Sequence, residues 1–129
     1  MNHQYIIIVA GGKGLRMGTD IPKQFISVAG LPVLMHTILR FKEANSSLRI
    51  VLVLPENQQE FWKKLCLEYE FVIEHSIACG GETRFHSVKN GLAMIAGEGL
   101  VGVHDAVRPL VSIETIQNCF ETAQEKGNA

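Results

Sequence analysis

Short apolar runs rich in β-branched residues alternate with stretches of helical periodicity along this chain, and this alternation limits the folds open to it. The runs predict buried strands at residues 5–9, 49–54 and 100–103, and a shorter strand within 71–79. Strands that alternate with helices form a parallel sheet covered by helices on both faces. We therefore expect an α/β fold with a Rossmann-like, mostly parallel sheet.

Each helix is predicted from apolar residues that recur on one face at i, i+3, i+4 or i+7. We expect Trp62 to pack in the core rather than to bind a ligand. The expected stripes are Leu34, Ile38 and Phe41 after Pro32; Phe61, Leu65 and Tyr69 within 57–69; Phe85, Val88, Leu92 and Ile95 from about Glu82; and Ile113, Ile116, Phe120 and Ala123 after Ser112.

The composition is that of an ordinary globular protein, because 47% of the 129 residues are hydrophobic and 19% are charged. This length predicts a single domain over residues 1–129. The formal net charge of -1 provides no basic excess for a nucleic-acid partner, so an anion site would depend on a local cluster of cations. No apolar run approaches the length of a membrane span, so we expect no membrane partner.

The three cysteines, Cys66, Cys79 and Cys119, are far apart and form no C-x-x-C pair. This spacing argues against a disulfide framework and against a structural zinc site. We expect reduced thiols in a cytoplasmic protein.

A glycine-rich loop with several cations directly follows the first predicted strand. It reads Ala-Gly-Gly-Lys-Gly-Leu-Arg-Met-Gly over residues 10–18, and Pro-Lys-Gln follows at 22–24. Glycines let the backbone approach a ligand closely, while Lys13, Arg16 and Lys23 supply positive charge. The loop therefore predicts a phosphate site.

Two better-known glycine loops do not fit this stretch. The Rossmann dinucleotide fingerprint G-x-G-x-x-G fails because Gly18 falls one position late, and the Walker pattern fails because no Gly-Lys-Ser or Gly-Lys-Thr occurs. The plainer alternative is a surface turn whose lysines are only solvated.

Two further segments are expected beside this loop, since ligands of parallel α/β sheets bind beyond the carboxyl ends of the strands. They are Gly80-Gly81, before a helix that carries Arg84 and Ser87, and His104-Asp105. Asp105 would repel phosphates unless a magnesium ion lay between them, so we predict a Mg²⁺ ligand there. The alternatives for this carboxylate are a cap or an ion pair with Arg108.

The remaining chemistry of this edge is limited. We expect His104 to be a packed side chain rather than a base, and the other histidines show no metal-ligand spacing. No nucleophilic triad or cysteine nucleophile is apparent. Cations, backbone donors and one metal ligand suit phosphoryl or nucleotidyl transfer, which depends on positioning and charge stabilisation.

Taken together, three motifs resemble the 2-C-methyl-D-erythritol 4-phosphate cytidylyltransferase family of non-mevalonate isoprenoid biosynthesis. The first motif alone is less specific, because sugar-nucleotide uridylyl- and guanylyltransferases have similar loops. The resemblance runs from residue 5 to the end of the chain and implies a nucleotidyltransferase fold similar to glycosyltransferase A. The motifs lie at residues 10–17 with 22–24, at 80–88 with 91–92, and at 103–109.

The resemblance implies that the phosphate of methylerythritol phosphate attacks the α-phosphorus of CTP and that pyrophosphate leaves. Arg16 and Lys23 match transition-state stabilisers, and Asp105 matches a residue at the magnesium and nucleotide site. Gly81, Glu82 and Ser87 match positions near the cytosine, and Arg84 is expected to brace their loop. The implied nucleotide-binding residues are Ala10, Gly11, Gly12, Lys13, Gly14, Gly81, Glu82, Arg84, Ser87, Asp105 and Ala106.

Two departures from the family pattern stand out. The loop opens with Ala10-Gly11 where two alanines are common, which should only loosen the backbone. The chain also ends at Ala129, where another core strand is expected, so we expect a truncated chain that lacks the C-terminal part. Family members continue with a projecting dimerisation arm and a late segment, and the resemblance implies a homodimer for the full-length protein.

Three alternatives stay open at this point. One is a ribitol or ribulose 5-phosphate cytidylyltransferase, because the residues that select the sugar-alcohol phosphate come from the expected missing part. The second is a CTP-binding module without turnover. The third is a structural α/β domain without a ligand.

Overall fold

Four parallel strands form the central sheet of the computed structural model, which describes residues 3–10, 22–95 and 99–106. The strands are β1 (His3–Val9), β4 (Arg49–Leu54), β5 (Ser76–Cys79) and β6 (Gly99–Asp105), in the order β5-β4-β1-β6. All three strand pairings are parallel, which confirms the predicted sheet and its strands. The helix predicted after Ser112 lies outside the described residues, and the single domain over 1–129 stays a prediction.

The two middle strands, β1 and β4, are apolar along most of their length, at residues 5–9 and 50–54, because both of their faces are covered. In β1, Ile6 and Ile8 face one side of the sheet, where they join one hydrophobic cluster. Ile7 and Val9 face the other side and join a second cluster. Successive side chains of a strand point to opposite faces, so a strand covered on both sides must be apolar throughout.

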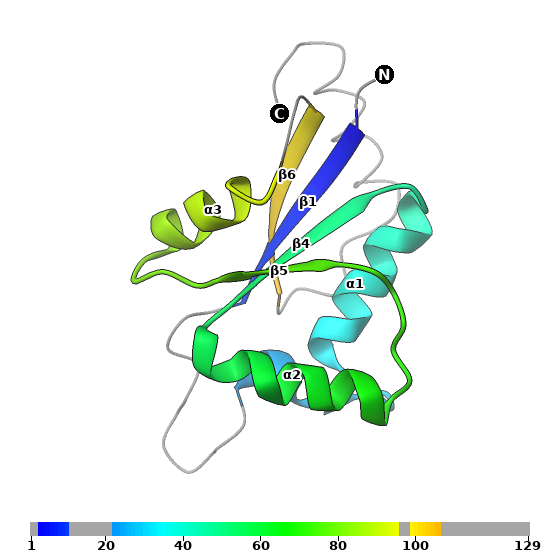
Figure 1. Ribbon diagram of the computed structural model, residues 1–129. Coiled ribbons are helices and arrows are strands. Elements are labelled where there is room, and N and C mark those ends of the chain that lie inside the picture. The colour runs from blue at the N-terminus through cyan, green and yellow to red at the C-terminus, as the bar shows by residue number, and fades with distance from the viewer. Residues whose placement is uncertain (1–2, 11–21, 96–98, 107–129) are drawn as a thin grey trace.

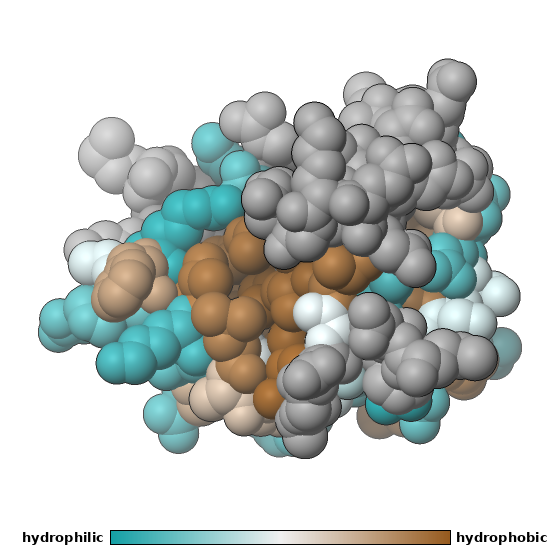
Figure 2. Space-filling model, turned by 90° about the horizontal axis from the view of Figure 1, so that it is seen from above, coloured by the Kyte–Doolittle hydropathy of each residue, from teal (hydrophilic) through white to brown (hydrophobic). Residues whose placement is uncertain are grey.

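Helices cover both faces of this sheet, as predicted. The helices α1 (Val33–Ala44) and α2 (Glu56–Glu68) pack on one face, and α3 (Arg84–Leu92) packs on the other (Figure 1). Seen from above, brown apolar residues occupy the middle of the molecule and teal hydrophilic residues its margins (Figure 2). Pro32 precedes α1 as its N-cap residue.

The buried face of α2 differs from the predicted stripe. Leu65 is buried as expected, but Phe61 is 40% exposed, and Trp62 is fully buried instead. Trp62 stacks on Phe25 with a centroid separation of 6.0 Å, and its indole N–H donates to His75 Nε2 at 3.0 Å. The prediction that Trp62 packs in the core is therefore confirmed.

The predicted stripe of α3 is confirmed only in part. Val88 and Ile95 pack against the second cluster as predicted, but Phe85 is 71% and Leu92 46% exposed. Ser87 and Gly91 are the buried residues of this helix. A Cβ atom on Gly91 would lie 2.9 Å from Ile7 Cγ2, so the helix rests on the sheet at its glycine. Because the helix contacts the sheet at Gly91, Phe85 and Leu92 are left on its outer side. The spacing of apolar residues in the sequence does not predict this orientation.

A short segment joins the glycine-rich stretch to α1. It contains the 3-10 helix η1 (Lys23–Phe25) and a two-strand hairpin of β2 (Ser27–Val28) and β3 (Leu31–Pro32). Gln24, next to Lys23, is buried and donates from Nε2 to Gln58 Oε1 of α2 at 2.6 Å. This buried amide pair holds the Lys23 segment against α2.

Replacing Gly91 by valine tests the close contact between α3 and the sheet. The valine improves helix propensity slightly, but overpacking against Ile7 costs more, so we expect a net loss of about 1–3 kcal/mol in the free energy of unfolding. Urea unfolding followed by the fluorescence of Trp62, the single tryptophan, measures this loss. The matched control is Lys89→Val, at an exposed position of the same helix; equal stability of the two variants would contradict the packing argument.

Replacing Gln24 by leucine tests the buried amide pair. The change leaves the Gln58 side chain without its partner, and we expect it to lower the free energy of unfolding by about 1–3 kcal/mol. In the double variant Gln24→Leu/Gln58→Leu both polar groups are gone, so most of the loss should be recovered. Strictly additive losses in the same urea experiment would show that the two side chains act independently.

Candidate nucleotide site

The parallel register brings the carboxyl ends of the strands to one edge of the sheet. Val9 of β1 stands opposite Asp105 of β6, and the Ala106 N–H donates to the Val9 carbonyl at 2.9 Å. On the other side of β1, the Ala10 N–H donates to the Val53 carbonyl at 3.0 Å. Residues predicted from distant parts of the chain thus lie together at this edge.

The loop between β5 and α3 ends at the same edge. The Gly80 N–H donates to the Leu54 carbonyl at 2.8 Å, which places this loop next to the end of β4. The Gly81 N–H donates to the buried Ser87 hydroxyl at 2.9 Å. A Cβ atom on Gly81 would lie only 2.4 Å from the His86 Cβ, so the loop requires glycine at this position.

Two amides that sequence analysis missed also support this loop. Asn90 of α3 donates from Nδ2 to the Cys79 carbonyl at 2.8 Å, and Gln59 of α2 donates to the Leu54 carbonyl at 3.1 Å. Asn90 follows Ser87 by three residues, so both lie on one face of α3. The spacing from Ser87 could have identified Asn90 as a site residue. No feature of the sequence marks Gln59 in this way.

Asp105 and Arg84 form an ion pair across this edge, between the Asp105 Oδ1 and the Arg84 Nη1. Arg84 is the first residue of α3, and Asp105 is the last residue of β6. The side chains are 56% exposed for Arg84 and 35% exposed for Asp105. Sequence analysis expected Arg84 to brace its own loop and named Arg108 as a possible partner of Asp105; Arg108 lies outside the described residues.

Ala106 is held from the opposite side of the sheet by Thr37 of α1. This threonine is fully buried, and its hydroxyl donates to the Ala106 carbonyl at 2.8 Å. The bond ties the end of β6 to α1. A threonine among the apolar residues of this helix could have predicted a buried hydrogen bond at this position.

The remaining predicted residues are placed as follows. Lys23 is exposed on η1, whose neighbour Phe25 packs edge-on against Phe61 of α2 at 5.2 Å. Glu82 is exposed in the loop that precedes α3. Gly11, Gly12, Lys13, Gly14 and Arg16 lie outside the described residues.

The donor set agrees with a metal ion shared with a ligand rather than held by protein alone. Within residues 3–10, 22–95 and 99–106, no group of three or more His, Cys, Asp or Glu side chains could hold a metal ion. Mg²⁺ is commonly bound by one or two carboxylates together with substrate phosphates and water. The half-exposed Asp105 carboxylate fits that mode of binding.

Two other candidate reactive groups have packing roles. His104 contacts the Phe41 ring edge-on with a centroid separation of 4.9 Å, in agreement with the expected packed side chain. Burial raises the pKa of the Cys66 thiol to about 11, so this thiol stays protonated near neutral pH.

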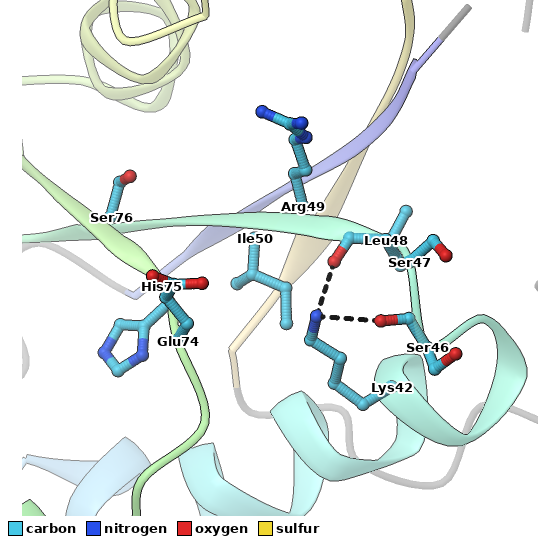
Figure 3. A pocket seen from close by; sticks show the side chains of 9 residues that line it. All are labelled: Lys42, Ser46, Ser47, Leu48, Arg49, Ile50, Glu74, His75 and Ser76. Carbon is cyan, nitrogen blue, oxygen red and sulfur yellow. Dashed lines mark hydrogen bonds between the residues drawn. The ribbon is translucent and has the colours of Figure 1, made fainter.

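A polar cavity of about 560 Å³ lies at the amino-terminal ends of β4 and β5, far along the strands from the candidate site (Figure 3). Its lysine, Lys42, donates to the carbonyls of Ser46 and Leu48 at 3.2 and 2.8 Å. The Arg49 side chain points away from His75 in this view. Lys42 therefore holds the loop between α1 and β4, and it does not form a cluster of cations with Arg49 that could bind an anion in the cavity.

The chain is similar to known proteins in sequence and in fold. The family model for 2-C-methyl-D-erythritol 4-phosphate cytidylyltransferase matches residues 4–129. Enzymes of that name from Phocaeicola vulgatus and Bacteroides thetaiotaomicron are 64% identical over 124 residues and 62% identical over 122 residues. These alignments cover 96% and 95% of this chain but only 57% and 56% of the two relatives.

The fold agrees as well. A crystal structure of 4-diphosphocytidyl-2C-methyl-D-erythritol synthase from Anaerococcus prevotii superimposes with a TM-score of 0.77 at 26% identity, over 96% of this chain and 52% of that one. The chain thus spans about half the length of the relatives it matches. Because the family model matches nearly every residue, the chain belongs to the 2-C-methyl-D-erythritol 4-phosphate cytidylyltransferase family.

Proposed function

We propose that the complete protein carrying this chain transfers a cytidylyl group from CTP to 2-C-methyl-D-erythritol 4-phosphate. The products are 4-diphosphocytidyl-2-C-methyl-D-erythritol and pyrophosphate, in non-mevalonate isoprenoid biosynthesis. The observation that carries the proposal is the meeting of the Gly81–Ser87 loop, Arg84 and Asp105 at the carboxyl edge of the sheet. The family membership supports the choice of substrates.

The triphosphate would lie over the stretch that begins at Ala10. A phosphate oxygen of the acceptor attacks the α-phosphorus, and the bond to the pyrophosphate oxygen breaks. Negative charge spreads over the phosphoryl oxygens in the transition state, where Arg16 and Lys23 are assigned to stabilise it. The Gln24–Gln58 pair holds the backbone next to Lys23 and limits its freedom.

Base recognition is assigned to the loop at Gly81, Glu82 and Ser87. The Ser87 oxygen accepts the Gly81 N–H, so its own O–H remains available to donate. Cytosine presents an acceptor at N3 where uracil presents an N–H donor. A hydroxyl that donates to the base at this atom would therefore favour cytosine.

Mg²⁺ is the assigned divalent cation, with Asp105 as its protein ligand. When bound, the ion would neutralise charge on the triphosphate and help to orient it. Ala106 and Ala10, which flank this carboxylate across the β1–β6 pairing, are assigned to the nucleotide site.

The wider assignment is a cytoplasmic homodimer that acts without a nucleic-acid or membrane partner. It rests on the family resemblance, the near-neutral net charge and the isolated cysteines. In the described part of the chain, no helix has the length and apolar character needed to cross a bilayer.

We expect the complete protein to release pyrophosphate when it is incubated with CTP, Mg²⁺ and methylerythritol phosphate. A coupled pyrophosphate assay measures the rate, and UTP in place of CTP is the control for base selection. Parallel reactions with ribitol 5-phosphate and ribulose 5-phosphate test the alternative that one of these is the acceptor. Turnover with either of these and none with methylerythritol phosphate would exclude the proposed acceptor, and CTP binding without any turnover would favour a binding module.

Replacement of Lys23 or Arg16 by alanine should lower kcat by about 10²–10³-fold, because each cation is assigned to charge that develops in the transition state. The affinity for CTP should fall much less, which steady-state kinetics and calorimetry can separate. Lys64→Ala, at an exposed position of α2, is the charge-matched control. A loss of CTP affinity with unchanged kcat would mean that the two cations bind only the ground state.

A further inference from the structure

The carboxylate assigned to the metal ion is engaged by a side chain of this protein. Asp105 Oδ1 accepts from the Arg84 guanidinium, which reaches across from the first turn of α3. The two residues come from different elements, since β6 ends at Asp105 and α3 begins at Arg84. The pairing therefore depends on the tertiary fold and not on local sequence.

A guanidinium and a divalent cation compete for the same carboxylate. Each needs the oxygens of Asp105, and two positive charges held a few ångströms apart repel each other. Both side chains are partly exposed, and exposed ion pairs contribute little stability, so a metal ion can displace the guanidinium at modest cost. Arg84 has five N–H donors, which suit phosphate oxygens once it is displaced.

We propose that Arg84 and the divalent cation exchange places on Asp105 as the nucleotide binds. Arg84 neutralises the carboxylate through the ion pair. When the cation arrives with the triphosphate, Asp105 passes to the cation and Arg84 is released to the phosphates. This proposal rests on the assignment of Asp105 to the metal ion under the proposed function, and it gives Arg84 a role in metal loading beyond the bracing of its loop.

Binding of Mn²⁺ alone to the complete protein, followed by electron paramagnetic resonance, tests the competition without any turnover. Arg84→Met removes the competing cation, so Mn²⁺ should bind roughly two- to fivefold more tightly than to Lys89→Met. Lys89 lies on the same helix and is exposed, so its variant removes one positive charge without breaking the ion pair. Arg84→Lys keeps the positive charge but loses the planar guanidinium that can pair with a carboxylate through two N–H groups. This variant should therefore bind Mn²⁺ with intermediate affinity.

Calorimetry with CTP in the presence of a chelator tests the released guanidinium. Asp105→Asn removes the negative charge that retains Arg84, so metal-free CTP should bind more tightly to this variant than to the unmodified protein. The gain should disappear in the double variant Arg84→Met/Asp105→Asn, and Arg84→Met alone completes the cycle that measures the coupling between the two side chains.

The outcomes separate this proposal from the proposed function. Equal Mn²⁺ affinities for Arg84→Met and Lys89→Met would overturn the exchange even if the enzyme transfers cytidylyl groups, and so would a metal-free CTP affinity that Asp105→Asn leaves unchanged. A lack of cytidylyl transfer with a clear difference in Mn²⁺ affinity would instead reject the proposed reaction and retain the exchange.

Discussion

Parallel pairing of β1 with both of its neighbours is the constraint on which the rest of the molecule depends. It buries the strand on both faces and places Val9 opposite Asp105. Parallel strands have their carboxyl ends at the same edge, so loops far apart in the sequence are brought together there. This register directly positions Ala10, Asp105 and Ala106 of the candidate site. The opposite edge carries the cavity at Lys42, whose ammonium is used to close a loop.

The candidate site is built from polar side chains that are anchored by the two helical layers. On one face, Thr37 holds the Ala106 carbonyl, and the Gln24–Gln58 pair secures the Lys23 segment. On the other face, α3 holds the end of β5 and the Gly80–Gly81 loop through Ser87 and Asn90. Gly91 makes this possible, because it lets α3 approach the sheet closely enough for these short side chains to reach the loop. The packing of α3 on the sheet therefore also sets the geometry of the candidate site.

The Arg84–Asp105 pair connects this architecture to chemistry. In the proposed triphosphate site, a lone carboxylate is unfavourable unless a positive charge accompanies it. The fold provides Arg84 as the positive charge beside Asp105, and the proposed cation would take its place when the nucleotide binds. A half-exposed pair suits this exchange, since a deeply buried pair would be costly to separate.

The sequence by itself determined the strand order along the chain, the α/β class and the motifs that resemble the family, because these depend on local periodicity and on residue types at fixed spacing. It also placed Trp62 in the core. The buried stripe of α1 was also predicted correctly, with Leu34, Ile38 and Phe41 all in the core. Only the tertiary structure decided the buried faces of α2 and α3: Phe85 lies outward because Gly91 makes the closer contact with Ile7. Likewise, only the fold brought Arg84 to Asp105. Their pairing depends on how α3 packs against the sheet that contains β6, and no short-range sequence pattern predicts that the two residues are in contact.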